Sequence, residues 1–147
     1  CKFVEDKDVY FLHRGRLLDY ANSEYDRGHM SPAKDVTVSE EALQETFYLS
    51  NVCPQKPELN RGLWKSLENH IRALLAKHKI LHAYIGPIFL PDMTIPCKFY
   101  AHYEILSKSR IGVPTHFFKI IIGKSVEEAY LISNELKATE LYFQHLL

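Results

Sequence analysis

The clearest pattern in the chain is a stretch in which apolar positions recur at the spacing of a helix. Between Pro57 and Lys79, apolar side chains return about every 3.6 residues, as on one face of an amphipathic helix. These apolar residues are Leu63, Leu67, Ile71, Leu74 and Leu75. Pro57 suits the first helical position, and Glu58 suits the positive end of the helix dipole. The pattern therefore predicts one long helix that ends near Lys79.

A shorter helix and several strands are expected on either side of it. Ser39, which two glutamates follow, is typical of an N-cap and predicts a helix that ends near Glu45. Aromatic and β-branched runs between turn residues indicate strands or short extended pieces. These runs are Val9–Leu12, Phe47–Val52, Leu81–Leu90, Phe99–Leu106, Thr115–Ile122 and the shorter Ala129–Ser133. The apolar segment Thr139–Leu147 fits either a short helix or a strand.

Strands that follow helices without regular alternation predict an α+β fold with a mainly antiparallel sheet. The 147 residues are enough for one domain, spanning 1–147, with its own core, and the hydrophobic share of 46% argues against disorder. No apolar run approaches the roughly 18 residues that span a bilayer, and no targeting segment is visible. The three cysteines (Cys1, Cys53 and Cys97) form no metal-type pair, which favours reduced thiols.

Charge gives little sign of the partner. The chain has 18 basic and 18 acidic residues, so its net charge is zero when histidine is neutral. A protein that binds phosphates usually presents a basic surface. The balance therefore counts against a nucleic-acid partner, unless basic groups are concentrated locally.

The segment from Asp26 to Met30 combines several kinds of chemistry in a few residues. It places a carboxylate, a guanidinium, a glycine and an imidazole in succession. Gly28 is expected to allow a turn that other residues resist, so that the backbone aims His29. A histidine near its ordinary pKa can take a proton from water at neutral pH. The alternative is a surface turn with a solvated histidine, since the chain has eight histidines.

A second cluster lies on the long helix, where Asn60, Trp64, Glu68 and Arg72 follow one another at four-residue intervals. Asn60 and Glu68 are then about 12 Å apart along the axis, too far to share one ion directly. Magnesium keeps several of its waters, so Asn60 could bind it directly and Glu68 through water. The alternative for Glu68 and Arg72 is an ordinary surface ion pair, and Trp64 favours the core over a base-stacking role.

These motifs together resemble the DNA/RNA non-specific endonuclease family, over roughly residues 1–134. Within it, the similarity is greatest to the branch of endonuclease G and mitochondrial exo/endonuclease G. The matching motifs, in order, are Cys1–Phe3, Asp26–His29, Phe47–Asn51, Pro54–Gln55, Leu59–Asn60, Trp64, Gly86–Pro87 and Val113–Lys119.

The resemblance implies a ββα-metal fold, in which a hairpin presents the histidine and the next helix presents the asparagine that binds Mg²⁺ or Mn²⁺. It implies these roles: His29 as general base; Asn60 as direct metal ligand; Glu68 and Asp26 as acceptors for metal-bound water; Arg27 and Arg72 as phosphate-facing, nucleic-acid-binding cations; and Asn51 as a polar residue of the catalytic site. The implied products carry 5′-phosphate. The family also implies DNA and RNA substrates, a homodimer, no membrane and a mitochondrial location.

The sequence departs from the family pattern at several places. Family members have further strands before the segment that begins here at Cys1, with a phosphate-binding arginine among them, so the fold is expected to be N-terminally truncated. Ser31 and Asp35 replace the usual alanine and asparagine, and the similarity fades after Asn134.

Two other functions therefore stay open. One is a truncated or inactive relative that binds nucleic acid or a protein partner without cutting. The other is a structural zinc module that uses the histidines, although no CxxC spacing supports it.

Overall fold

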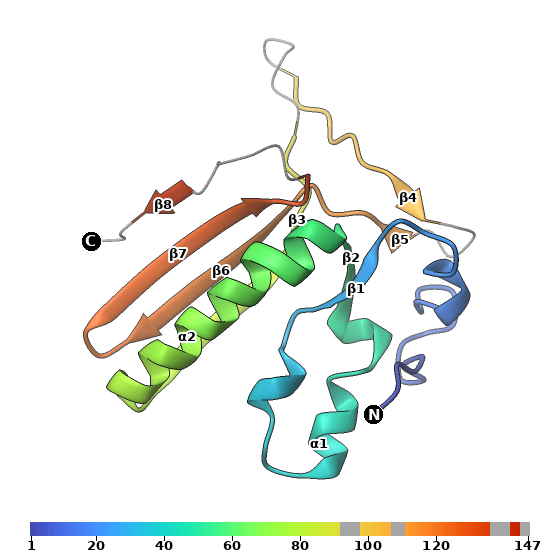
Figure 1. Ribbon diagram of the computed structural model, residues 1–147. Helices are drawn as coiled ribbons and strands as arrows, with labels where there is room; N and C mark the ends of the chain where they lie inside the picture. Colours follow the sequence, from blue (N-terminus) through green and yellow to red (C-terminus); the bar gives the residue numbers. More distant parts are fainter. Residues whose placement is uncertain (92–97, 107–110, 136–141, 145–147) are drawn as a thin grey trace. The chain divides into compact units, whose positions relative to one another are not determined.

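A computed structural model describes residues 1–91, 98–106, 111–135 and 142–144 (Figure 1). The chain forms two compact units, the first from Cys1–Gln55 with Glu104–Val113 and the second from Lys56–Tyr103 with Pro114–Leu147. In the described part of the chain, the strands of each sheet pair antiparallel and a long helix is present, which confirms the predicted α+β class. None of the described helices is long and apolar enough to cross a membrane. The single domain expected over residues 1–147 stays a prediction.

In the first unit, two short strands present the residues of the Asp26–Met30 motif. Strand β1 (Asp26–His29) pairs antiparallel with β2 (Val52–Gln55), so that His29 lies opposite Val52. Helix α1 (Glu40–Glu45) lies in the connection between the strands. Its N-cap is Ser39, whose hydroxyl accepts the N–H of Ala42 at 3.1 Å, which confirms the predicted cap. The unit's remaining elements are the 3₁₀ turns η1 (Leu17–Asp19), η2 (Ala33–Asp35) and η3 (Leu49–Asn51) and the strands β4 (Ile105–Leu106) and β5 (Ile111–Gly112).

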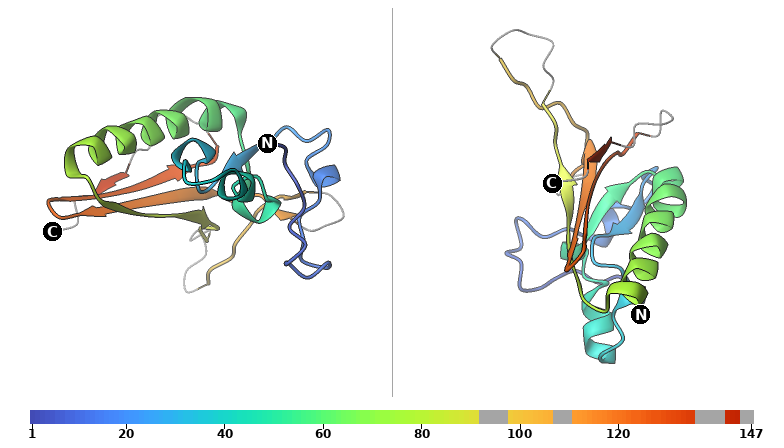
Figure 2. Two further views of the ribbon diagram at one scale, coloured as in Figure 1. Left: turned by 90° about the horizontal axis from the view of Figure 1, so that it is seen from below. Right: turned by 90° about the vertical axis from the view of Figure 1, so that its left-hand side faces the viewer.

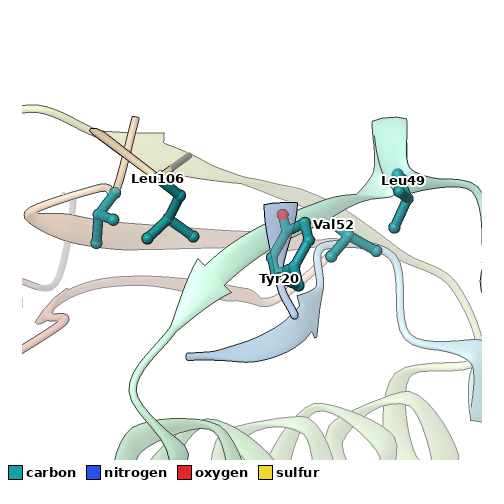
Figure 3. Packing of buried hydrophobic residues seen from close by; sticks show 5 residues of the cluster. Tyr20, Leu49, Val52 and Leu106 are labelled. Carbon is teal, nitrogen blue, oxygen red and sulfur yellow. The ribbon is translucent and has the colours of Figure 1, made fainter. Parts of the chain in front are cut away.

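A small apolar core supports this strand pair from within the first unit (Figure 3). Its buried members are Tyr20, Leu49, Val52, Leu106 and Val113. Each large apolar side chain that becomes fully buried contributes about 1.5–3 kcal/mol. Since Val52 is the residue opposite His29, this core fixes the end of the strand pair from which the imidazole projects.

In the second unit, one helix lies along one face of a four-stranded sheet (Figures 1 and 2). A π-helical segment, η4 (Leu59–Trp64), continues directly into α2 (Lys65–His78). The strand order is β3-β6-β7-β8. The strands are β3 (Leu81–Ile88), β6 (His116–Gly123), β7 (Val126–Ser133) and β8 (Tyr142–Gln144). Every second side chain along β6 points to this helix, and the centroids of the Trp64 and Phe117 rings are 5.4 Å apart.

The π-helical segment changes which residues of the long helix are buried. Leu59 and Trp64, five residues apart, are 0% and 1% exposed, as expected where the backbone follows an i→i+5 pattern. The predicted apolar stripe was correct at Leu67 but wrong at Leu75, which is 45% exposed. A uniform period of about 3.6 residues cannot anticipate the wider turn at the start of the helix. The predicted helix end is confirmed, because α2 stops at His78.

Several predicted strands differ from the observed ones. Val9–Leu12, expected as a short extended piece, contains a turn. In Phe47–Val52 the backbone makes the turn η3 before β2 begins, because aromatic residues pack equally well beside a turn. Phe99–Leu106 is a strand only at Ile105–Leu106, whereas β7 begins before the predicted Ala129 and extends over polar residues.

Other predictions fall wholly or partly outside the described residues. Within Thr139–Leu147, only Tyr142–Gln144 is described, and it is a strand that pairs with β7. Cys97 lies outside the described residues, while Cys1 and Cys53 are free thiols. Burial raises the pKa of the Cys53 thiol to about 11, so this group stays protonated at neutral pH.

Candidate functional site

Arg27 and His29 share one face of β1, because successive side chains of a strand point to opposite faces. Both contact the ring of Phe3: the Arg27 guanidinium carbon lies 5.2 Å from the ring centroid, and the centroids of the His29 and Phe3 rings are 5.1 Å apart. The guanidinium also lies 5.8 Å from the ring centroid of Tyr20. The first unit thus brings together a cation and an imidazole, two of the predicted site residues.

Gly28 allows two strands to approach each other closely and does not form a turn. It lies inside β1, and none of the described glycines has a positive φ, so the prediction that Gly28 allows a special turn was wrong. A Cβ atom at this position would lie 2.2 Å from Oε1 of Gln55 and 2.8 Å from its Cβ. Gln55 is fully buried, so its side chain has little room to move away.

The Gly28→Ala variant is therefore expected to lower the free energy of unfolding by about 1–3 kcal/mol, the usual cost of overpacking. Chemical denaturation measures this difference. The matched control is Gly62→Ala on η4, where an added Cβ meets nothing within 4 Å. Because alanine favours a helix over glycine, the control is expected to be neutral or slightly stabilising. Equal stability of Gly28→Ala and the parent chain would show that the clash does not exist.

His29 lies in an apolar environment that favours its neutral form. The ring is half-buried, and its Nε2 is enclosed without a hydrogen-bond partner among the described residues. Burial lowers the pKa of the imidazole below its ordinary value of 6.5. A neutral imidazole has one nitrogen that can accept a proton, as a general base must.

Asn51 fixes the backbone that follows His29. Its Nδ2 donates to the carbonyl oxygens of Ser31 and Thr46, both at 2.9 Å, and its Oδ1 accepts the N–H of Ser31 at 3.0 Å. The N–H of Met30 donates to the carbonyl oxygen of Asn51 at 2.9 Å. These bonds hold the loop after β1 against the start of β2. A direct part for Asn51 in catalysis stays a prediction.

In the second unit, Glu68 lies between two cations. Its Oε2 is 3.5 Å from Nη2 of Arg72, and its Oε1 is 3.9 Å from Nζ of Lys119. Lys119 is 0% exposed, and its ammonium lies 4.1 Å from the ring centroid of Trp64. The ion pair of Glu68 with Arg72 exists, and it is reinforced from inside by a buried charge. Trp64 is buried, which confirms its predicted place in the core.

Lys119 is a residue of this cluster for which the sequence reasoning predicted no role. It lies on the same face of β6 as Phe117 and Ile121, both of which are 0% exposed. A buried charge is costly unless a partner of opposite sign accompanies it. A lysine in phase with buried apolar residues was the available signal, and it could have indicated a carboxylate partner such as Glu68.

The second unit also fixes the start of the helix that carries Asn60. The side-chain oxygen of Asn134, which is buried, accepts the N–H of Lys56 at 2.9 Å, and its Nδ2 donates to the carbonyl oxygen of Pro114 at 2.9 Å. The N–H of Asn60 in turn donates to the carbonyl oxygen of Lys56 at 2.9 Å. The backbone of η4 is therefore tied to the strand end beside it.

The donor atoms fit a hydrated magnesium ion. Asn60 supplies an amide oxygen and Glu68 a carboxylate, and magnesium prefers oxygen ligands while it retains waters. Among the residues that the structure describes, no group of three or more His, Cys, Asp or Glu side chains could hold a metal ion. A structural zinc site, which needs four such ligands, therefore has no support in this part of the chain.

The predicted site residues fall into two sets, each inside one unit. Asp26, Arg27, His29 and Asn51 belong to the first unit, and Asn60, Glu68 and Arg72 belong to the second. The structure brings Arg27 and His29 together around Phe3, and Glu68 and Arg72 together with Lys119. The convergence of His29 and Asn60 on one ion stays a prediction, as do the metal-related roles of Asp26 and Asn60.

Comparisons with known proteins agree with the resemblance. A family model described as DNA/RNA non-specific endonuclease matches residues 1–144. "Endonuclease G, mitochondrial" from Bos taurus is 38% identical over 152 residues, which cover 100% of this chain and 51% of the bovine protein. "Mitochondrial nuclease" from Saccharomyces cerevisiae is 44% identical over 126 residues, which cover 84% of this chain and 38% of the yeast protein. The chain thus spans about half the length of the bovine relative and less of the yeast one.

A solved structure supports the same conclusion about the fold. The crystal structure of the EndoG/EndoGI complex contains a chain that superposes with a TM-score of 0.87 at 35% identity, covering 94% of this chain and 59% of that chain. This likeness confirms the predicted ββα-metal nuclease fold.

Proposed function

Because the chain belongs to the DNA/RNA non-specific endonuclease family, we propose that it hydrolyses phosphodiester bonds of DNA and RNA with little sequence preference, using Mg²⁺. The observation that carries the proposal is the neutral, half-buried imidazole of His29 on β1, within a motif that the family match covers. Relatives from cattle and yeast are named mitochondrial, so the proposal includes a mitochondrial location. The homodimer that the resemblance implies is part of the same proposal.

The proposed reaction begins with proton transfer to His29. The imidazole accepts a proton from water, and the resulting hydroxide attacks phosphorus opposite the 3′ oxygen. The bond from phosphorus to the 3′ oxygen breaks, the 3′ oxygen takes a proton from solvent, and the phosphate stays on the 5′ side. Asn60 would hold Mg²⁺ directly, and Glu68 and Asp26 would hold it through water. The bound ion would neutralise charge on the phosphate.

Two arginines serve substrate binding in this proposal. Arg27 lies beside His29, and Arg72 lies beside Glu68, so each of the two sets of proposed site residues contains a guanidinium. Guanidinium groups suit the paired oxygens of a phosphate. Contacts to the backbone carry no base information, which accounts for cleavage without a defined sequence. Local cations of this kind also reconcile a phosphate substrate with a net charge of zero.

Digestion of supercoiled plasmid and of single-stranded RNA tests the proposed function. We expect Mg²⁺-dependent loss of both substrates, inhibition by a chelator, and products that ligate without prior phosphorylation because they carry 5′-phosphate. Salt-sensitive binding of either substrate without any cleavage would instead support a relative that binds nucleic acid and does not cut it.

The pH dependence of cleavage follows from the position of the His29 pKa. The base works only as a neutral imidazole, and burial lowers its pKa, so activity is present above that pKa and falls as the pH drops through it. We therefore expect the acid limb of kcat/KM to have its midpoint below the ordinary 6.5 of histidine. A pH series at constant ionic strength measures the midpoint, and a limb above that value would contradict the apolar setting of the ring.

A further inference from the structure

We propose that Phe3 and Phe47 form an aromatic bracket that sets the orientation of the His29 imidazole for proton transfer. The two phenylalanines are positioning residues, since they act through His29 and carry no group that could react. The inference rests on the proposed function of His29 as general base. It assigns to these two residues a role beyond filling space.

The three rings form one mutual cluster. The centroid of the His29 ring lies 5.1 Å from that of Phe3, at an interplanar angle of 40°, and 4.9 Å from that of Phe47, at 86°. The two phenylalanine rings are 5.2 Å apart. These separations and tilted or edge-on arrangements are those that aromatic pairs prefer. The imidazole is therefore contacted by two rings that also support each other.

Backbone hydrogen bonds fix the two phenylalanines relative to each other. The N–H of Val4 donates to the carbonyl oxygen of Phe47 at 3.1 Å, and the N–H of Leu49 donates to the carbonyl oxygen of Val4 at 2.9 Å. Nε2 of Gln44 donates to the carbonyl oxygen of Lys2 at 2.9 Å. Residues on both sides of Phe3 are thus bonded to the connection that carries Phe47. Hydrogen bonds that involve the backbone therefore fix the positions of Phe3 and Phe47 relative to each other, in addition to the contact between their rings.

Among the described residues, no hydrogen bond at Nε2 provides this orientation for the ring. A hydrogen bond from the second nitrogen to a carboxylate or carbonyl oxygen commonly orients a functional histidine. Here Nε2 of His29 is enclosed and has no hydrogen-bond partner among the described residues. Ring packing is the contact that the structure shows around this imidazole, and the Arg27 guanidinium contacts the same Phe3 ring.

Loss of the bracket should affect the chemical step more than substrate binding. A ring that can rotate spends less time in the geometry that accepts the proton, and small misplacements of a catalytic group lower the rate. The Phe47 ring contacts His29 and Phe3, so its loss should leave substrate affinity unchanged. The Phe3 ring also contacts the phosphate-facing Arg27, so its loss affects a binding residue as well. The expected signature of Phe47→Leu is therefore a lower kcat with an unaltered KM, whereas Phe3→Leu should lower kcat and also raise KM through Arg27.

The test uses the full 147-residue chain with Phe3→Leu and Phe47→Leu, which keep apolar side chains but remove the rings. The matched control is Phe11→Leu, in the same unit, since Phe11 is 53% exposed and contacts Tyr10 instead. NMR follows the imidazole protons of His29, assigned by their absence in His29→Asn. Phe3→Tyr and Phe47→Tyr keep the rings and serve if a leucine variant does not fold.

We expect ring currents to shift the His29 imidazole resonances of the parent chain away from those of exposed histidines. Each leucine variant should reduce this shift, raise the titration midpoint of His29 and lower kcat about tenfold. KM should stay unchanged in Phe47→Leu, and the tyrosine variants and Phe11→Leu should resemble the parent chain. Unchanged His29 resonances in both leucine variants, or tyrosine variants that lose the shift, would overturn the bracket. A fall in kcat of the same size in the control Phe11→Leu would also overturn the bracket.

The NMR arm separates this inference from the proposed function. If the parent chain cleaves neither DNA nor RNA, the proposed function fails, yet the resonances still decide whether the two rings contact His29. If the parent chain cleaves and the resonances do not respond, the bracket fails and the proposed function stands.

Discussion

Replacement of His29 by alanine is expected to lower kcat for plasmid cleavage by about 10²–10⁴-fold, the usual contribution of a general base. The reason is that the variant lacks the neutral imidazole that would take the proton from the attacking water. Binding of the substrate should change little, because the phosphate-facing Arg27 and Arg72 remain. Gel assays of plasmid relaxation under single-turnover conditions measure the change.

The matched control for this prediction is His82→Ala, which removes an exposed histidine from β3 in the second unit. We expect the control to cleave at the rate of the parent chain. Addition of imidazole to His29→Ala should restore part of the activity if the lost group is a base. Cleavage by His29→Ala at the parent rate, with folding confirmed by circular dichroism, would remove His29 from the mechanism.

Replacement of Asn60 by alanine is expected to weaken Mg²⁺ binding by about 100-fold or more. Asn60 is the one direct protein ligand in the proposed site, whereas loss of an outer-shell partner alone commonly costs 10–100-fold. Activity should become dependent on high Mg²⁺ concentrations. Calorimetric titration with Mg²⁺ and the Mg²⁺ dependence of cleavage measure the two effects separately.

Two variants distinguish a ligand from a structural residue at this position. Asn60→Asp keeps a side-chain oxygen and should retain Mg²⁺ binding, since magnesium accepts carboxylates readily. Glu68→Gln removes the charge that Arg72 and Lys119 balance, and it should weaken Mg²⁺ binding less than Asn60→Ala does. Equal Mg²⁺ affinity in Asn60→Ala and the parent chain would exclude Asn60 as a ligand.

Features set by local sequence were predictable. The N-cap at Ser39 and the helix end near Lys79 follow from side chains and dipoles within one turn, and both are observed. The α+β class follows from the order of periodic and strand-like runs. The roles of His29 and Asn60 came from the order and spacing of motifs, and they stay predictions until the experiments above are done.

Features set by contacts between distant residues were not predictable. Gly28 was explained by turn chemistry, because nothing local shows that the Gln55 side chain lies against it. The apolar residues two positions on either side of Lys119 indicated its buried face, but nothing local identified Glu68 on the distant helix as its partner. The wider turn of η4 was not predicted, because a single helical period was assumed for the whole helix.

The central claim is that the His29 imidazole and the Asn60 amide serve one metal ion, and paramagnetic Mn²⁺ tests this most directly. Mn²⁺ broadens NMR signals of nuclei near it and can replace Mg²⁺ at oxygen ligands. The account predicts that substoichiometric Mn²⁺ broadens the His29 imidazole resonances selectively, and that Asn60→Ala abolishes this broadening. Mn²⁺ bound in an Asn60-dependent manner, with His29 resonances that stay sharp, would contradict it.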